Sequence, residues 1–142
     1  MCALNRRKSD KNTPFSKAKE KLFDINNELV KFSFKYLDKK HHKFCYDECG
    51  TDYFICLIDR LKDVSTMKMT EFRANKSKSL RAHSIDFKET SEPNFNIPGE
   101  EQFADEPFQF MVSVNEHGRV HGFLISNRFY IVWLDRNHNL YS

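Results

Sequence analysis

Three apolar segments separated by two turn sequences, all in the last third of the chain, constrain the fold more than any other feature. Apolar and polar residues alternate from Phe108 to Val114, and strand-like segments follow from Arg119 to Ile125 and from Phe129 to Asp135. Gly118 tolerates positive φ in the first turn, and Ser126-Asn127 makes a tight reversal. Strands joined by short turns pair antiparallel, so this region predicts a three-stranded meander. Its last strand is apolar on both faces and should be central or covered by a helix.

Helical periodicity is clearest in YFICLIDRLKD, which follows the capping sequence Gly50-Thr51-Asp52. The apolar residues that recur there at helical spacing are Phe54, Leu57, Ile58 and Leu61. A second, shorter helix is expected near Thr70 to Ala74. Both helices precede the meander, so they predict a central helical layer that packs on its sheet.

The first part of the chain predicts a tail, a helix and a strand. Residues 1–12 are polar and basic and are predicted to be disordered. Thr13 is an expected N-cap with Pro14 at the first helical position. The apolar face of that helix carries Leu22, Ile25 and Leu29. Alternation from Val30 to Tyr36 predicts a strand, and Leu80 to Phe87 predicts another.

Residues 89–107 contain three Pro, one Gly and six acidic residues without a basic one, which is the composition of a loop. The length of 142 residues suits one domain. The sequence therefore predicts a disordered basic tail at 1–12 and a single α+β domain at 13–142 that includes the acidic loop. The fold class is α+β, with an antiparallel sheet that ends in the three-strand meander and is packed by N-terminal and central helices.

Charge is distributed unevenly along the chain. Residues 1–43 hold twelve Lys or Arg and five Asp or Glu, whereas residues 89–142 hold three and eight. A basic N-terminal third is compatible with an anionic partner such as RNA or DNA, and equally with a solvated lysine-rich surface.

No run of apolar residues has the length of a membrane span, and no apolar stretch follows the basic residues of the N-terminus. The sequence therefore predicts a cytoplasmic protein without a membrane partner. The four cysteines are Cys2, Cys45, Cys49 and Cys56. In that compartment they are expected to be reduced thiols.

Two tripeptides with the same pattern, Arg81-Ala82-His83 and Arg119-Val120-His121, lie in predicted strands. Residues two apart on a strand point to the same face, so each pair presents a guanidinium beside an imidazole. Arginine can hold phosphoryl oxygens while histidine transfers a proton, which is useful for phosphate chemistry. The alternative is that both pairs are ordinary surface residues at strand ends.

The chain after the last strand reads DRNHNLYS and supplies a cation, an imidazole and a phenol in Arg136, His138 and Tyr141. Its end is expected to be anchored on the domain through Leu140 or Tyr141. The plain alternative is that these polar residues are surface only.

His41, His42, Cys45 and Cys49 are spaced as a potential zinc cluster. The sequence lacks a second pair of cysteines at short spacing, and buried Cys usually behaves as a small apolar residue. We therefore expect no metal and no other cofactor, with a zinc-stabilised domain kept as a hypothesis that elemental analysis tests.

The segment from Arg119 to Tyr141 resembles the last strands and His/Tyr tail of the RelE/YoeB/HigB group of toxin ribonucleases. The order of elements from Phe32 onward is similar to that group as well. The resemblance implies an mRNA interferase-like hydrolase in which His138, Tyr141 and Arg119 serve the reaction. The length of the chain, its acidic loop and the few Lys or Arg in the final strands depart from the group.

The favoured hypothesis is a metal-independent endoribonuclease, the toxin of a toxin–antitoxin or phage-defence system. Its expected partners are RNA, including mRNA bound to the ribosome, and an antitoxin protein. His138 or His121 would transfer the proton, and Arg81 and Arg119 would stabilise the charge of the transition state. Tyr141 would orient the phosphate or stack on a base. His83 is a further candidate site residue. The alternative is a non-enzymatic module that binds nucleic acid or protein.

Overall fold

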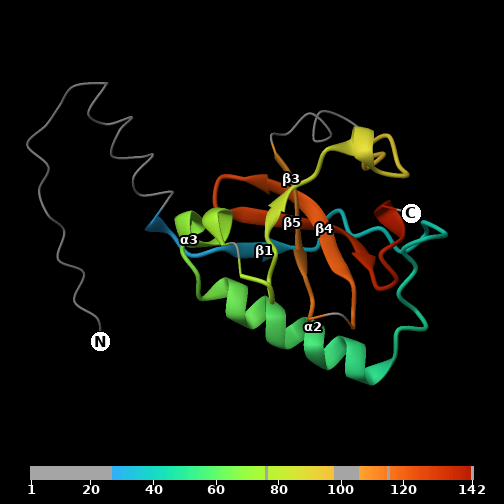
Figure 1. Cartoon of the computed structure of the whole chain (residues 1–142), viewed down its shortest axis with the longest axis horizontal. Helices are drawn as coiled ribbons and strands as arrows, with labels where there is room; N and C mark the ends of the chain where they lie inside the picture. The colour runs from blue at the N-terminus through green and yellow to red at the C-terminus, as the bar shows by residue number, and fades with distance from the viewer. Residues whose placement is uncertain (1–26, 76, 98–105, 115, 142) are drawn as a thin grey trace, which may run out of the picture.

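The computed structural model describes residues 27–75, 77–97, 106–114 and 116–141. In this part of the chain a five-stranded sheet carries two helices on one face and long loops on the other (Figure 1). The predicted tail at 1–12 and most of the helix predicted from Thr13 lie outside the described residues.

The strands are β1 (Lys31–Ser33), β2 (His83–Ser84), β3 (Glu106–Met111), β4 (Arg119–Ile125) and β5 (Arg128–Asp135). Their order in the sheet is β1-β5-β4-β3-β2. The predicted meander β3-β4-β5 is confirmed, and β5 occupies an interior position as its two apolar faces predicted. The α+β class is confirmed with it.

The prediction of an antiparallel sheet is wrong at one edge, because β1 pairs with β5 in parallel and the sheet is mixed. The meander alone justified antiparallel pairing, since its strands are joined by short turns. β1 is separated from β5 by both helices and three strands, and a connection of that length permits either orientation.

Both predicted central helices are confirmed as α2 (Gly50–Ser65) and α3 (Met69–Ala74). The apolar face expected for α2 is only half right. Leu57 and Leu61 are buried, but Phe54 is 36% exposed and Ile58 61% exposed. The residues that α2 buries are Tyr53, Leu57, Leu61 and Val64. α2 carries apolar residues on both sides, so helical periodicity alone could not identify the side that packs on the sheet.

The core has two parts, one on each face of the sheet. Below α2 and α3, the ring of Phe72 contacts Phe108 at a centroid distance of 5.1 Å. On the opposite face, Phe44 stacks on Trp133 at 4.5 Å, and Phe95 meets the same indole at 4.9 Å. Among the described residues no α-helix contributes to the second part, and loops with short 3₁₀ turns cover that face.

Several strands have bounds other than those predicted. β1 ends at Ser33 because a turn follows, in which Leu37 N donates to Phe34 O. β2 covers only two residues of the strand predicted over Leu80–Phe87, since Arg81 has φ +45° and a 3₁₀ turn, η1 (Phe87–Glu89), follows. β3 begins at Glu106 and ends at Met111, whereas the predicted strand ran from Phe108 to Val114. The last two residues of the loop predicted at 89–107 therefore belong to β3.

No helix among residues 27–75, 77–97, 106–114 and 116–141 is long and apolar enough to cross a bilayer.

Candidate functional site

A row of polar residues crosses the sheet on the face opposite α2. His83 of β2 is the register partner of Gln109 in β3, which in turn is the partner of His121 in β4. Arg119 lies two residues before His121 on β4, and its register partner is Asp135 at the end of β5. Alternate residues of a strand share a face, so the sheet brings these side chains together from four strands.

A buried imidazole–carboxylate pair forms the centre of the row. His121 Nε2 donates to Asp135 Oδ2 at 3.0 Å, and both side chains are buried. The same carboxylate accepts from the backbone N–H groups of Asn139 at 2.7 Å and Leu140 at 3.0 Å. These bonds hold the C-terminal 3₁₀ turn η3 (Asn139–Tyr141) on the sheet, and the expected anchoring through Leu140 is confirmed.

The burial of the pair determines its protonation. Complete burial lowers the pKa of His121, although the Asp135 carboxylate opposes this. Burial raises the pKa of Asp135, but the hydrogen bond from His121 and the N–H donors outweigh it, so its pKa is lowered overall. Near neutral pH the pair is therefore a neutral imidazole that donates to an ionised carboxylate, with the proton on Nε2 inferred from that bond.

Arg119 and Tyr141 form the outward part of the row. The Arg119 guanidinium lies over the Tyr141 ring at 5.6 Å from its centroid, and Tyr141 is 39% exposed. Burial raises the pKa of the Tyr141 phenol, while Arg119 and Gln109 act in the opposite direction. A half-buried cation and a protonated phenol are thus presented together at the surface.

His83 is exposed at the other end of the row, and its imidazole is engaged on both nitrogens. Nδ1 lies 2.8 Å from Ser84 O, and the Gln109 amide donates to the ring. Gln109 itself is fully buried between the two histidines of the row. His83 therefore supports Gln109 rather than offering a free lone pair.

The row retains unused hydrogen-bonding capacity. Four of its buried polar atoms have no hydrogen-bond partner within the described part of the chain: Gln109 Oε1, Arg119 Nε, His121 Nδ1 and Trp133 Nε1. Trp133 is the register partner of His121 on β5. Buried polar atoms are usually paired, so such a group beneath one surface marks a candidate binding or catalytic site.

Of the six residues proposed from the sequence, four lie in the row: His83, Arg119, His121 and Tyr141. His138 is exposed with φ +56°, close enough to His121 to lower its pKa, and directly precedes η3. Arg81 lies outside β2 with an exposed side chain and positive φ, so it does not share a strand face with His83 as expected. Strand alternation placed His121 correctly but gave no sign that it is inaccessible to solvent.

Sequence reasoning missed Gln109 and Asp135, which connect the row. A signal for Gln109 was present, because a polar residue between Phe108 and Phe110 must face away from the helical side of the sheet. Asp135 was placed only as the last residue of a strand. Its role depends on the backbone N–H groups of Asn139 and Leu140 donating to its carboxylate, which the strand pattern does not indicate.

The four residues of the potential zinc cluster have other surroundings. His41 stacks on His42 and pairs with Glu92 at 3.4 Å, while Cys45 is exposed and Cys49 buried as free thiols. In the described ranges, no three His, Cys, Asp or Glu side chains are grouped so that they could hold a metal ion.

No family model, curated protein or solved structure matches the chain.

Proposed function

We propose that the protein is a metal-independent endoribonuclease that acts at the surface of the polar row. The observation that carries the proposal is the pairing of a cation with a phenol, Arg119 over Tyr141, near buried polar atoms that have no hydrogen-bond partner among the described residues. The resemblance of residues 119–141 to the RelE/YoeB/HigB group supports the same reaction. That resemblance also implies a toxin or phage-defence setting. RNA, including ribosome-bound mRNA, is the proposed substrate, and an antitoxin protein the proposed regulator.

The residues of the row suit distinct roles. Arg119 would bind the phosphate and stabilise the charge of the phosphorane-like transition state, with Tyr141 orienting a phosphate oxygen. His138 is the proposed proton-transfer group because it is exposed, whereas His121 is fully buried. His121 and Asp135 would act as positioning residues that hold η3 in place.

The reaction would follow the usual course of metal-independent RNA cleavage. The 2′-oxygen attacks the adjacent phosphorus and loses its proton to a base, while the bond from phosphorus to the 5′-oxygen breaks and that oxygen is protonated. The products are a 2′,3′-cyclic phosphate and a 5′-hydroxyl. No metal takes part, so cleavage should persist in EDTA.

Cleavage of RNA in EDTA tests the proposal. We expect Arg119→Ala and His138→Ala to reduce the rate by about 100-fold or more, the range for loss of charge stabilisation or of general acid–base catalysis. The measurement is the appearance of cyclic-phosphate ends on RNA, free and on ribosomes. The matched control is His42→Ala, which removes another exposed histidine from a loop outside the row.

Cleavage by His138→Ala at the rate of His42→Ala would contradict the proposed role of His138. Absence of cleavage by the unmodified protein on both substrates would contradict the endoribonuclease itself.

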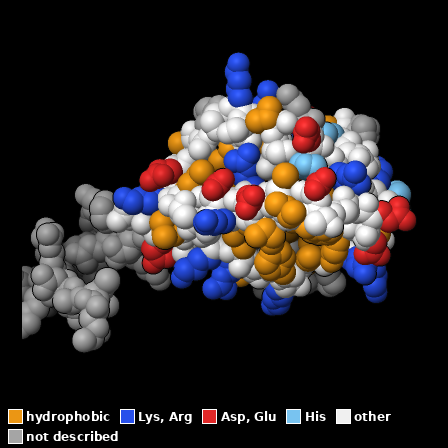
Figure 2. All heavy atoms as spheres, turned by 90° about the horizontal axis from the view of Figure 1, so that it is seen from below, with side chains coloured by type: hydrophobic (Ala, Val, Ile, Leu, Met, Phe, Trp, Pro, Cys, Tyr) orange, Lys and Arg blue, Asp and Glu red, His pale blue; other side chains and the backbone are white. Residues whose placement is uncertain are grey.

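A specific observation also favours a protein-binding module. The outer side of α2 presents an apolar surface, which is seen along the lower face of the molecule in Figure 2. Ile55 is 55% exposed and Ile58 61% exposed, beside Phe54. Asp59 lines the same surface, so the complementary partner would present an apolar helix face with a basic residue beside it.

Ile58→Glu tests this second function. The free energy of unfolding should change by less than about 0.5 kcal/mol, because the side chain is exposed in the monomer. A partner that binds the purified protein should lose at least about tenfold in affinity, since a charge enters an apolar contact. Val114→Glu is the matched control, at a position exposed by 50% on a strand connection. Equal effects of the two variants on binding would exclude the α2 surface.

A further inference from the structure

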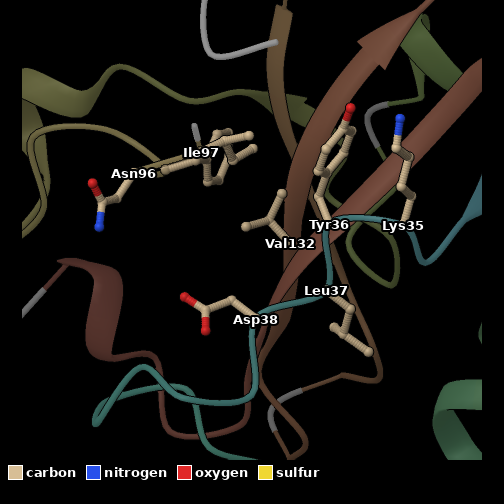
Figure 3. A pocket seen from close by; sticks show the side chains of 8 residues that line it. Lys35, Tyr36, Leu37, Asp38, Asn96, Ile97 and Val132 are labelled. Atoms are coloured by element: carbon tan, nitrogen blue, oxygen red, sulfur yellow. The ribbon is translucent and has the colours of Figure 1, made fainter. Parts of the chain in front are cut away.

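A pocket opens on the loop-covered face of the sheet, between the segment after β1 and the loop before β3 (Figure 3). Tyr36 lies on one side, Asn96 on the opposite side and the Asp38 carboxylate below the opening between them in this view. The residues that line it are Lys35, Tyr36, Leu37, Asp38, Phe95, Asn96, Ile97 and Val132. Lys35, Asp38 and Asn96 supply polar groups among the apolar and aromatic lining residues, and a few convergent polar groups of this kind are typical of small-molecule sites.

Asp38 supplies an acceptor held in a fixed orientation. Its Oδ1 accepts from the backbone N–H groups of Lys40 at 2.9 Å and His41 at 3.2 Å. Oδ2 has no hydrogen-bond partner among the described residues, so both of its lone pairs are available. A ligand with two neighbouring N–H donors on one edge is therefore the complement of this oxygen.

Aromatic and amide groups complete the pocket. The Tyr36 ring is supported by Phe123 and Tyr130 at centroid distances of 5.7 and 5.5 Å, and the Lys35 ammonium lies 5.0 Å from its centroid. Asn96 has φ +54° and an exposed side chain whose amide can donate and accept. A ligand that suits these groups would have a planar ring to lie beside Tyr36 and an anionic group attracted to Lys35. A nucleotide has both.

We propose that this pocket binds a guanine base, with its N1–H and exocyclic amine donating to Asp38 Oδ2. Among the RNA bases, guanine presents two adjacent donors on one edge, which adenine lacks. The proposal rests on the ribonuclease function above and specifies it: the pocket would select guanine in the RNA substrate. Two well-placed hydrogen bonds of this kind discriminate between bases by about tenfold or more.

Titration of the full chain with GMP, IMP and AMP tests the pocket without cleavage. We expect GMP to bind about tenfold more tightly than AMP, and IMP, which lacks the exocyclic amine, to bind between them. Asp38→Asn keeps an oxygen for the two backbone donors but turns the outward atom into a donor. It should remove the preference for GMP. Asp47→Asn, the same change on an exposed aspartate of the same loop, should leave it unchanged.

Equal affinity for GMP and AMP would overturn the proposal, and so would loss of the preference in both aspartate variants. Asn96→Gly is the second variant, because glycine adopts positive φ without strain and only the amide is lost. It should weaken GMP binding; unchanged binding would remove Asn96 from the site. GMP preference in a protein that does not cleave RNA would contradict the proposed reaction alone. Cleavage without any guanine preference would contradict the pocket alone.

Discussion

Gly122→Ala is expected to cost more than about 3 kcal/mol, enough to unfold a domain of ordinary stability under mild conditions. A Cβ on Gly122 would stand 2.0 Å from the carbonyl oxygen of Tyr130 and 2.7 Å from the ring of Phe129. The first of these contacts is with backbone of the neighbouring strand, so β4 and β5 would have to separate where their register already shifts. Chemical denaturation followed by circular dichroism measures the loss.

Gly50→Ala is the matched control for this substitution. Gly50 has φ +82°, but a Cβ there would meet nothing within 4 Å. The cost should therefore be the left-handed backbone penalty alone, about 1–2 kcal/mol. If Gly122→Ala proves no more destabilising than Gly50→Ala, the close approach of β4 to β5 is wrong.

Asp135→Ala is expected to destabilise the protein by about 3 kcal/mol or more, because three hydrogen-bond donors lose their acceptor at about 1–3 kcal/mol for each one that is buried. The substitution leaves the N–H of His121 and two backbone N–H groups of η3 without an acceptor. Because those bonds fasten η3 to the sheet, the last residues should become accessible to carboxypeptidase. Denaturation and protease protection measure the two effects.

The same pair predicts acid sensitivity. The pKa of His121 is lowered in the folded state, so its contribution is complete above the unfolded value of about 6.5 and declines as pH falls below it. The pKa of Asp135 is lowered as well, so its contribution is lost only at lower pH, as the carboxylate is protonated below about 3.9. Stability should therefore decrease in two stages on acidification.

His121→Gln separates the two stages, since glutamine can donate to Asp135 but does not titrate. The first stage, below about pH 6.5, should flatten in this variant and persist in His42→Gln, whose histidine is exposed. An unchanged profile in His121→Gln would show that another group causes the loss.

Local patterns were sufficient for the meander and both central helices. Turn residues and alternation act over a few positions, so the bounds of β4 were predicted at Arg119 and Ile125. The parallel pairing of β1 and the true packing side of α2 were beyond such patterns. Both depend on residues distant in sequence. Because α2 has apolar residues on both of its sides, helical periodicity could not tell which side packs on the sheet.

The site was predictable as a set of residue types but only partly as a geometry. Period-two alternation correctly joined Arg119 and His121 on one face. Alternation contains no information on what covers that face, so the burial of His121 under the C-terminal turn was unexpected. Arg81 failed for a different reason: its positive φ interrupts the extended backbone that the prediction required.

The position of β5 between β1 and β4 has a consequence during synthesis. β1 is translated before both helices and the other four strands, yet its only described neighbour in the sheet is β5, the last of those strands. Until then the edge of β1 has no strand to pair with, and premature termination anywhere before Arg128 would leave the sheet divided. Folding should therefore be slow for a domain of this size, since closure over so long a loop must precede the contacts that stabilise it.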